Sequence, residues 1–300
     1  MAGQDEPAAG VVLDSLEQLL APLDEQVWKK KRDEDFPALR SWGALLDFRA
    51  ELVVAAEFHR ANVPYALGNT KVSNPDFLLD AYGLGLEVNS KSPSGLTDLC
   101  EEIEELLHRH HPSAGALITA SVYPSRMTGD NITLVRKHVA SALEAADGAA
   151  VTPLTVVVKD SKNVTDVHLT VALTDQGSVN WQVEAGDLTV PLGSAEYAAV
   201  EAGRSPAKAK QGCAMPGRVM LAVDLSRYGA AWMRPAWVWA GRLARAIPAD
   251  FPFGALAVFR QSIEYPGILQ PAVGIASHLP AEDQDRFRRL CADLSWAASA

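Results

Sequence analysis

The chain has 300 residues, of which 48% are hydrophobic and 21% are charged, and its formal net charge is -10. This composition is typical of a globular protein, and the lack of a run of about 18 apolar residues argues against a transmembrane helix. The negative charge opposes nonspecific binding to nucleic acid, although a local basic patch can still bind a phosphate backbone.

The N-terminal residues and the cysteines indicate a compartment. The first residues, Met-Ala-Gly-Gln-Asp-Glu-Pro, are acidic and lack the basic and apolar regions of a secretory signal. The three cysteines, Cys100, Cys213 and Cys291, are odd in number and far apart, so we expect no disulfide framework. We therefore expect a cytoplasmic protein without a membrane partner.

Apolar periodicity predicts that helices and strands alternate in the first half of the chain. A proline at position 64 ends the second helix, and Pro93 ends the hairpin that follows it. In chain order we expect helices at 11–32 and 41–61, a strand at 63–67, a hairpin at 74–90, a helix at 99–110, a buried strand at 116–122 and a helix at 130–146.

Strands dominate the second half, which predicts a mixed α/β protein elaborated towards its C-terminus. Residues 203–217 show no periodicity and are expected to form a flexible loop. We expect a flexible segment and helix at 1–40, a core at 41–148 and an α+β elaboration at 149–300, either separate or continuous with the core sheet. The expected elements are strands at 154–159, 164–173, 179–183, 219–225 and 255–262, and helices at 236–246 and 282–297.

The predicted hairpin carries two carboxylates. Along its second strand Glu87, Asn89 and Lys91 share one face, because side chains alternate with period two. If residues 80–83 form the turn, Asp76 lies directly opposite Glu87, with Cβ atoms about 5 Å apart. Two carboxylates this close repel unless a proton or a cation lies between them, and Mg²⁺ or Mn²⁺ suits such oxygen ligands.

The helix at 41–61 adds a third acid. Placed at helical angles, Glu51 falls among Phe48, Val54, Ala55 and Phe58 and not on the polar face. A carboxylate on an apolar face needs a partner. Two alternatives remain open: a metal ion or metal-bound water, and an ordinary salt bridge or hydrogen bond.

This order of features resembles the core of the PD-(D/E)xK, or restriction-endonuclease-like, nuclease superfamily. A helix with Glu51, a strand that opens Pro75-Asp76, a second strand with Glu87, a further helix and a buried strand cover residues 41–125. The resemblance implies an αβββαβ core around a mixed central sheet. It also implies that Asp76, Glu87 and Glu51 bind Mg²⁺ or Mn²⁺ for hydrolysis of phosphodiester bonds.

One position departs from the motif, because Asn89 stands where the family has its lysine. Asparagine can orient water but cannot supply positive charge. Lys91 shares the strand face and lies about 7 Å farther along it, within partial reach of a lysine stem. We therefore expect Lys91, with Asn89, to position water and phosphate. The basic residues Arg204, Lys208 and Lys210 are interpreted as solvated surface.

Two functions from different classes follow, beside a third interpretation in which these acids are only surface charges of an α/β domain. The first is a metal-dependent nuclease whose substrate is nucleic acid, with DNA expected before RNA and a homodimer as one assembly. The alternative is an inactive nuclease fold that binds nucleic acid or protein, which Asn89 favours. The net charge of -10 favours protein as the partner in that alternative.

Overall fold

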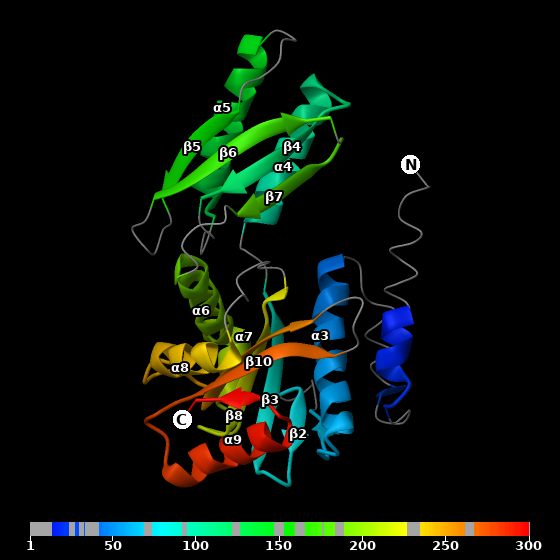
Figure 1. Ribbon diagram of the computed structural model, residues 1–300, viewed down its shortest axis with the longest axis vertical. Coiled ribbons are helices and arrows are strands. Elements are labelled where there is room, and N and C mark those ends of the chain that lie inside the picture. Colours follow the sequence, from blue (N-terminus) through cyan, green and yellow to red (C-terminus); the bar gives the residue numbers. More distant parts are fainter. Residues whose placement is uncertain are drawn as a thin grey trace. The chain divides into compact units, whose positions relative to one another are not determined.

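The computed structural model is a mixed α/β protein, as the sequence predicts, with a seven-stranded and a four-stranded sheet. The chain divides into two compact units, residues 1–91 with 199–300, and residues 92–198 (Figure 1). The boundary expected at 148/149 falls inside the second unit. The structure describes residues 14–23, 28–29, 33, 42–68, 74–91, 95–121, 127–146, 153–159, 166–175, 177–183, 189–226, 235–261 and 267–299.

The seven-stranded sheet of the first unit has the order β1-β2-β3-β8-β9-β10-β11. β1, β2 and β3 are antiparallel neighbours, whereas β3, β8 and β9 run parallel. The sheet is therefore mixed. Its strands are β1 (Ala66–Leu67), β2 (Phe77–Leu79), β3 (Leu84–Ser90), β8 (Val219–Asp224), β9 (Ala255–Gln261), β10 (Ile268–Ile275) and β11 (Ala297–Ala298).

A turn at residues 80–83 fixes the register of the β2–β3 hairpin. Leu79 pairs with Leu84, which confirms the register expected from the sequence. The amide of Gly83 donates to the carbonyl of Asp80 at 3.0 Å, and Gly83 has a φ of 63°. Glycine adopts this left-handed conformation without a Cβ clash, so the turn can be short.

Helices cover both faces of this sheet. α3 (Trp42–Arg60) and α9 (Ala281–Asp293) bury one face. The part of α6 (Thr189–Arg204) from Ala199 onwards, α7 (Pro206–Gly212) and α8 (Ala236–Ala246) lie on the other. Phe58 of α3 packs edge-on against Phe77 of β2 with ring centroids 5.3 Å apart. The core under α3 and α9 includes Phe58, Phe77, Leu79, Leu84, Leu86, Val88, Met220, Ala222, Phe259, Val273, Phe287 and Leu290.

The second unit has its own sheet, of order β5-β6-β4-β7. α4 and α5 cover one face, and the alternating apolar residues of the strands pack beneath them. The other face carries polar pairs such as Thr155 with Thr170, whose hydroxyls are 3.1 Å apart. Its elements are α4 (Leu96–His110), β4 (Gly115–Ala120), α5 (Gly129–Ala146), β5 (Leu154–Lys159), β6 (Asp166–Thr174) and β7 (Val179–Val183).

The expectation that a helix at 99–110 and a strand at 116–122 complete the core around the hairpin is wrong. The helix and strand expected to complete the core, now α4 and β4, belong to the second unit. The parallel neighbour of β3 is β8, more than a hundred residues later in the chain. Residues 203–217, expected to be a loop, contain the end of α6 and all of α7. The expectation failed because it paired β3 with the next strand in the chain, whereas a complete folded unit, residues 92–198, lies between β3 and its partner β8 in sequence.

The segment expected at 1–40 lies largely outside the described residues. Within the described parts of the chain, no helix combines the length and the apolar character needed to cross a bilayer.

The closed core of the second unit predicts that residues 92–198 fold when expressed alone. Within β5, Val158 is 1% exposed and Val157 is 45% exposed. In this fragment, Val158→Ala is expected to lower the free energy of unfolding by about 1–3 kcal/mol, because it deletes buried apolar surface. Val157→Ala is the matched control and should have little effect in urea titrations followed by circular dichroism. A fragment without a cooperative transition would contradict the prediction.

Candidate functional site

The site is built on the hairpin of the first unit, where Asp76 and Glu87 come face to face. Continuing the register of β2 and β3 by one residue places them opposite each other. The two are tied across the strands, because the amide of Asp76 donates to Glu87 Oε2 at 3.1 Å. Glu87 is fully buried and Asp76 is half-buried. The acid pair predicted from the sequence is therefore present.

The backbone of Val88 links these two acids to the end of the hairpin. β2 begins at Phe77, whereas β3 continues to Ser90, so among the described residues no strand pairs with the β2 side of β3 at Val88. Side chains satisfy its peptide groups instead. The amide of Val88 donates to Asp76 Oδ2 at 2.8 Å, and its carbonyl accepts a hydrogen bond from Lys208 Nζ at 3.0 Å.

Lys208 supplies the positive charge of the site. It extends from α7, which lies over β3 and β8, and its ammonium also forms an ion pair with Glu87 Oε1. The Lys208 side chain is 21% exposed, so it joins the buried acid to solvent. The sequence interpretation of Lys208 as a solvated surface charge was wrong. Ser205 followed by Pro206 is a typical helix start that could have revealed α7, but no local signal indicates what the helix faces.

The protein groups around Glu87 favour its protonated form. Burial, reinforced by the neighbouring charge of Asp76, raises the pKa of Glu87 to about 8. Lys208 acts in the opposite direction through its charge and hydrogen bond but does not compensate for desolvation. A buried acid with a raised pKa beside a second acid has the electrostatic character of a cation-binding or acid–base site.

Glycines make room for the segment that carries Asp76. A Cβ at Gly85 would lie 2.6 Å from Pro75 Cγ, and one at Gly68 would lie 1.8 Å from the Pro75 carbonyl oxygen. The amide of Gly68 donates to the Asp76 carbonyl at 2.8 Å. Pro75 is therefore held between two glycine-bearing segments, and this packing sets the position of Asp76.

Two other predicted site residues, Glu51 and Lys91, do not join the pair formed by Asp76 and Glu87. No group of three His, Cys, Asp or Glu side chains able to hold a metal occurs among the described residues. Glu51, half-buried on α3, is therefore not the third member of the acid cluster that the sequence suggested. Among the described residues, the side chain of Lys91 forms no ion pair with Asp76 or Glu87. Its amide donates to the Asp224 carbonyl at 2.9 Å.

Asn89 occupies the motif position two residues after Glu87. It lies on the same strand face as Glu87, as predicted, and its side chain is partly buried. Its Oδ1 atom is shielded from solvent and accepts no hydrogen bond from the residues that the structure describes. An unused acceptor this close to the acids is available to a water molecule or a ligand.

A second polar cluster lies at the carboxyl ends of β8 and β9, on the opposite face of the sheet. Asp224 accepts hydrogen bonds from Ser90 Oγ at 3.1 Å and from Gln261 Nε2 at 2.7 Å, and both its oxygens are used. Arg49 of α3 is fully buried and donates to Gln261 Oε1 at 2.5 Å. Burial lowers the pKa of Arg49, and Asp224 partly offsets this shift. These hydrogen bonds fasten α3 to the sheet.

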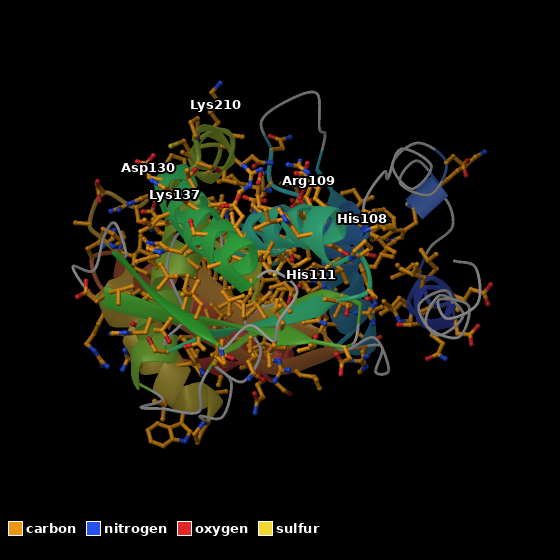
Figure 2. All side chains as sticks on the ribbon, turned by 90° about the horizontal axis from the view of Figure 1, so that it is seen from above. His108, Arg109, His111, Asp130, Lys137 and Lys210 are labelled. Carbon is orange, nitrogen blue, oxygen red and sulfur yellow. The ribbon has the colours of Figure 1, made fainter. Side chains whose placement is uncertain are left out.

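The histidine-rich end of α4 is exposed. Figure 2 shows His108 and Arg109 on this helix, with His111 just beyond it. Arg109 places a positive charge in the last turn of α4, where cations interact favourably with the helix C-terminus.

Comparison with protein-family models, with curated proteins and with solved structures finds no match to this chain. The functional argument therefore depends on the geometry of Asp76, Glu87 and Lys208.

The packing around Pro75 predicts the effect of Gly85→Ala. The new methyl group would displace the proline ring and the Asp76 that follows it, and overpacking of this kind costs about 1–3 kcal/mol. Gly129→Ala is a suitable control, because a Cβ there meets no atom within 4 Å. Thermal unfolding of the two variants and the wild type measures the difference. Equal melting temperatures for Gly85→Ala and the wild type would contradict the proposed packing.

The raised pKa of Glu87 predicts how stability depends on pH. From pH 4.5 to about 8 the folded chain retains a proton that the unfolded chain has lost, so the free energy of unfolding falls as pH rises. Glu87→Gln removes this titration, and its stability should fall less over the same window. Urea denaturation at several pH values measures both slopes. A slope unchanged in Glu87→Gln would refute the assignment.

Proposed function

We propose that this chain hydrolyses phosphodiester bonds of nucleic acid with a divalent cation, on a restriction-endonuclease-like core. The observation that carries the proposal is the opposed acid pair Asp76 and Glu87 with the ammonium of Lys208 on Glu87. A nuclease of this class needs acids for the cation and a positive charge close to them. Asn89 replaces the motif lysine on β3, and Lys208 of α7 supplies an ammonium group to Glu87 instead.

The order of elements in the first unit also supports the proposal. α3 is followed by the antiparallel strands β1, β2 and β3, then by helices and the parallel strand β8. This is the order helix–three strands–helix–strand implied by the resemblance, with residues 92–198 inserted after β3. Fold likeness alone does not define an activity, so the site chemistry has to carry the assignment.

The acids present are compatible with Mg²⁺ or Mn²⁺. Mg²⁺ is commonly bound through one or two carboxylates, with water and substrate phosphate as its remaining ligands. Asp76 and Glu87 would hold the cation, and the half-buried Asp76 opens the pair to solvent. Once bound, such a cation lowers the pKa of the attacking water and stabilises charge on the phosphate.

The other residues of the site have separable roles. Lys208 attracts the scissile phosphate and compensates the charge that develops on it. Asn89, with its unused Oδ1, accepts a hydrogen bond from the attacking water and orients it. The exposed Arg204 precedes Lys208 in sequence and provides local positive charge for a nucleic-acid backbone, DNA or RNA, on a chain that is otherwise acidic.

A second candidate function is a nuclease-like fold that has lost activity and binds a protein or nucleic acid. Two observations favour it. Lys208 already contacts Glu87, and no third acid joins the pair among the described residues. The net charge of -10 makes a protein the better partner in that case.

The nuclease proposal predicts metal-dependent cleavage of mixed DNA and RNA substrates. Glu87→Gln and Lys208→Met should each lower the cleavage rate by about 10²-fold or more, because each removes a charge that acts on the transition state. Lys210→Met is the matched control, since this exposed lysine points outward from the same helix (Figure 2). Its rate should stay within a few-fold of the wild type.

Two results would reject the nuclease proposal. Cleavage that persists without divalent cations or in Glu87→Gln would place the activity elsewhere or in a contaminant. A wild type that binds Mn²⁺ but cleaves neither DNA nor RNA would favour the second candidate.

A further inference from the structure

The ammonium of Lys208 lies where a small cation would be expected in the site. Its Nζ contacts a carboxylate oxygen, Glu87 Oε1. It also donates to a main-chain carbonyl oxygen, that of Val88, at a distance of 3.0 Å. Carboxylate and carbonyl oxygens are the ligands that hard divalent cations prefer. The second acid, Asp76, is bonded to the amide of the same Val88.

The architecture explains why these oxygens converge on an ammonium. β3 extends beyond β2, so the carbonyl of Val88 points away from every strand that the described residues form next to it on that side. Glu87, fully buried beside Asp76, needs a positive charge or a proton. Lys208 answers both requirements, because one ammonium group can donate to the carbonyl and the carboxylate together.

We propose that Lys208 is a tethered competitor of the divalent cation. In the metal-free protein its ammonium occupies the cation position against Glu87, and binding of Mg²⁺ or Mn²⁺ requires it to leave. Two positive charges cannot share this small oxygen cluster without strong repulsion. The inference depends on the proposed metal site and adds that cation entry and lysine release are one event.

The position of Lys208 makes such a release feasible. Its side chain is 21% exposed and reaches the acid along a flexible four-carbon stem. Movement of the stem alone, with α7 in place, carries the ammonium towards solvent, where a substrate phosphate would arrive. The lysine would thus become available to substrate only when the cation has replaced it.

The test compares Mn²⁺ affinity of the full-length wild type, Lys208→Met and Lys210→Met by isothermal titration calorimetry. Lys208→Met is expected to bind Mn²⁺ at least tenfold more tightly than the wild type, because the competing ammonium has been removed. Lys210→Met, which changes the charge of the same helix by the same amount, should match the wild type. Lys208→Met without metal should also melt at a lower temperature, with Mn²⁺ restoring the loss.

A second measurement uses the wild type and so does not depend on a variant that folds. Lysine acylation followed by mass spectrometry reports the accessibility of each ammonium group. Mg²⁺ should raise the labelling rate of Lys208 and leave that of Lys210 unchanged. A Lys208 rate unaffected by saturating Mg²⁺ would overturn the inference.

The binding results separate this inference from the proposed function. If the wild type and Lys208→Met bind Mn²⁺ equally well, competition is refuted and the metal-dependent function stands. If only Lys208→Met binds Mn²⁺, competition is supported, and the metal-dependent function of the wild type fails. If neither protein binds Mn²⁺, both proposals fall.

Discussion

The unequal lengths of β2 and β3 are the constraint from which the site follows. Beyond the start of β2, the peptide groups of Val88 have no strand partner within the described part of the chain, and buried peptide groups must be satisfied in some other way. Asp76 takes the amide and Lys208 takes the carbonyl. The difference in strand length thus explains why Asp76 and Lys208 bind the backbone of Val88. The neighbouring Glu87 contacts both of these residues. The polar site therefore forms at the point where the pairing of β2 with β3 ends.

The burial of Glu87 makes the balance of charge around it decisive. In a fully buried position an ionised carboxylate is costly unless it is paired, and the nearby Asp76 increases that cost. Proton, ammonium and metal ion are three ways to meet the same requirement. By contrast, Asp224 has its oxygens occupied by neutral donors and needs no external ligand. The difference between the two acids lies in their partners, since both are buried.

The sequence could predict the local part of the site but not the part that depends on distant contacts. The opposition of Asp76 and Glu87 follows from the length of one turn and the two-residue period of a strand, both of which are local. Lys208 lies 121 residues from Glu87, and nothing near it in sequence indicates that contact. Glu51 was favoured because helical angles place it among apolar residues. Arg49 lies about 200° round the helix from Glu51, on nearly the opposite side, yet Arg49 is fully buried and Glu51 is only half-buried. Helical angle alone therefore did not predict which charge of α3 is buried.

The insertion of residues 92–198 has a consequence for how the chain comes to fold. β3 and β8 are neighbours in the sheet, yet the hydrogen bond between Ser90 and Asp224 joins residues 134 positions apart. Closing so long a loop costs entropy and slows pairing, whereas the inserted unit has only its own, more local contacts to form. During synthesis the second unit emerges complete before β8 exists. The nascent chain therefore presents the hairpin with β3 as an open edge and with Glu87 lacking its lysine, and the acid pair acquires its tethered cation only when the second half of the sheet arrives.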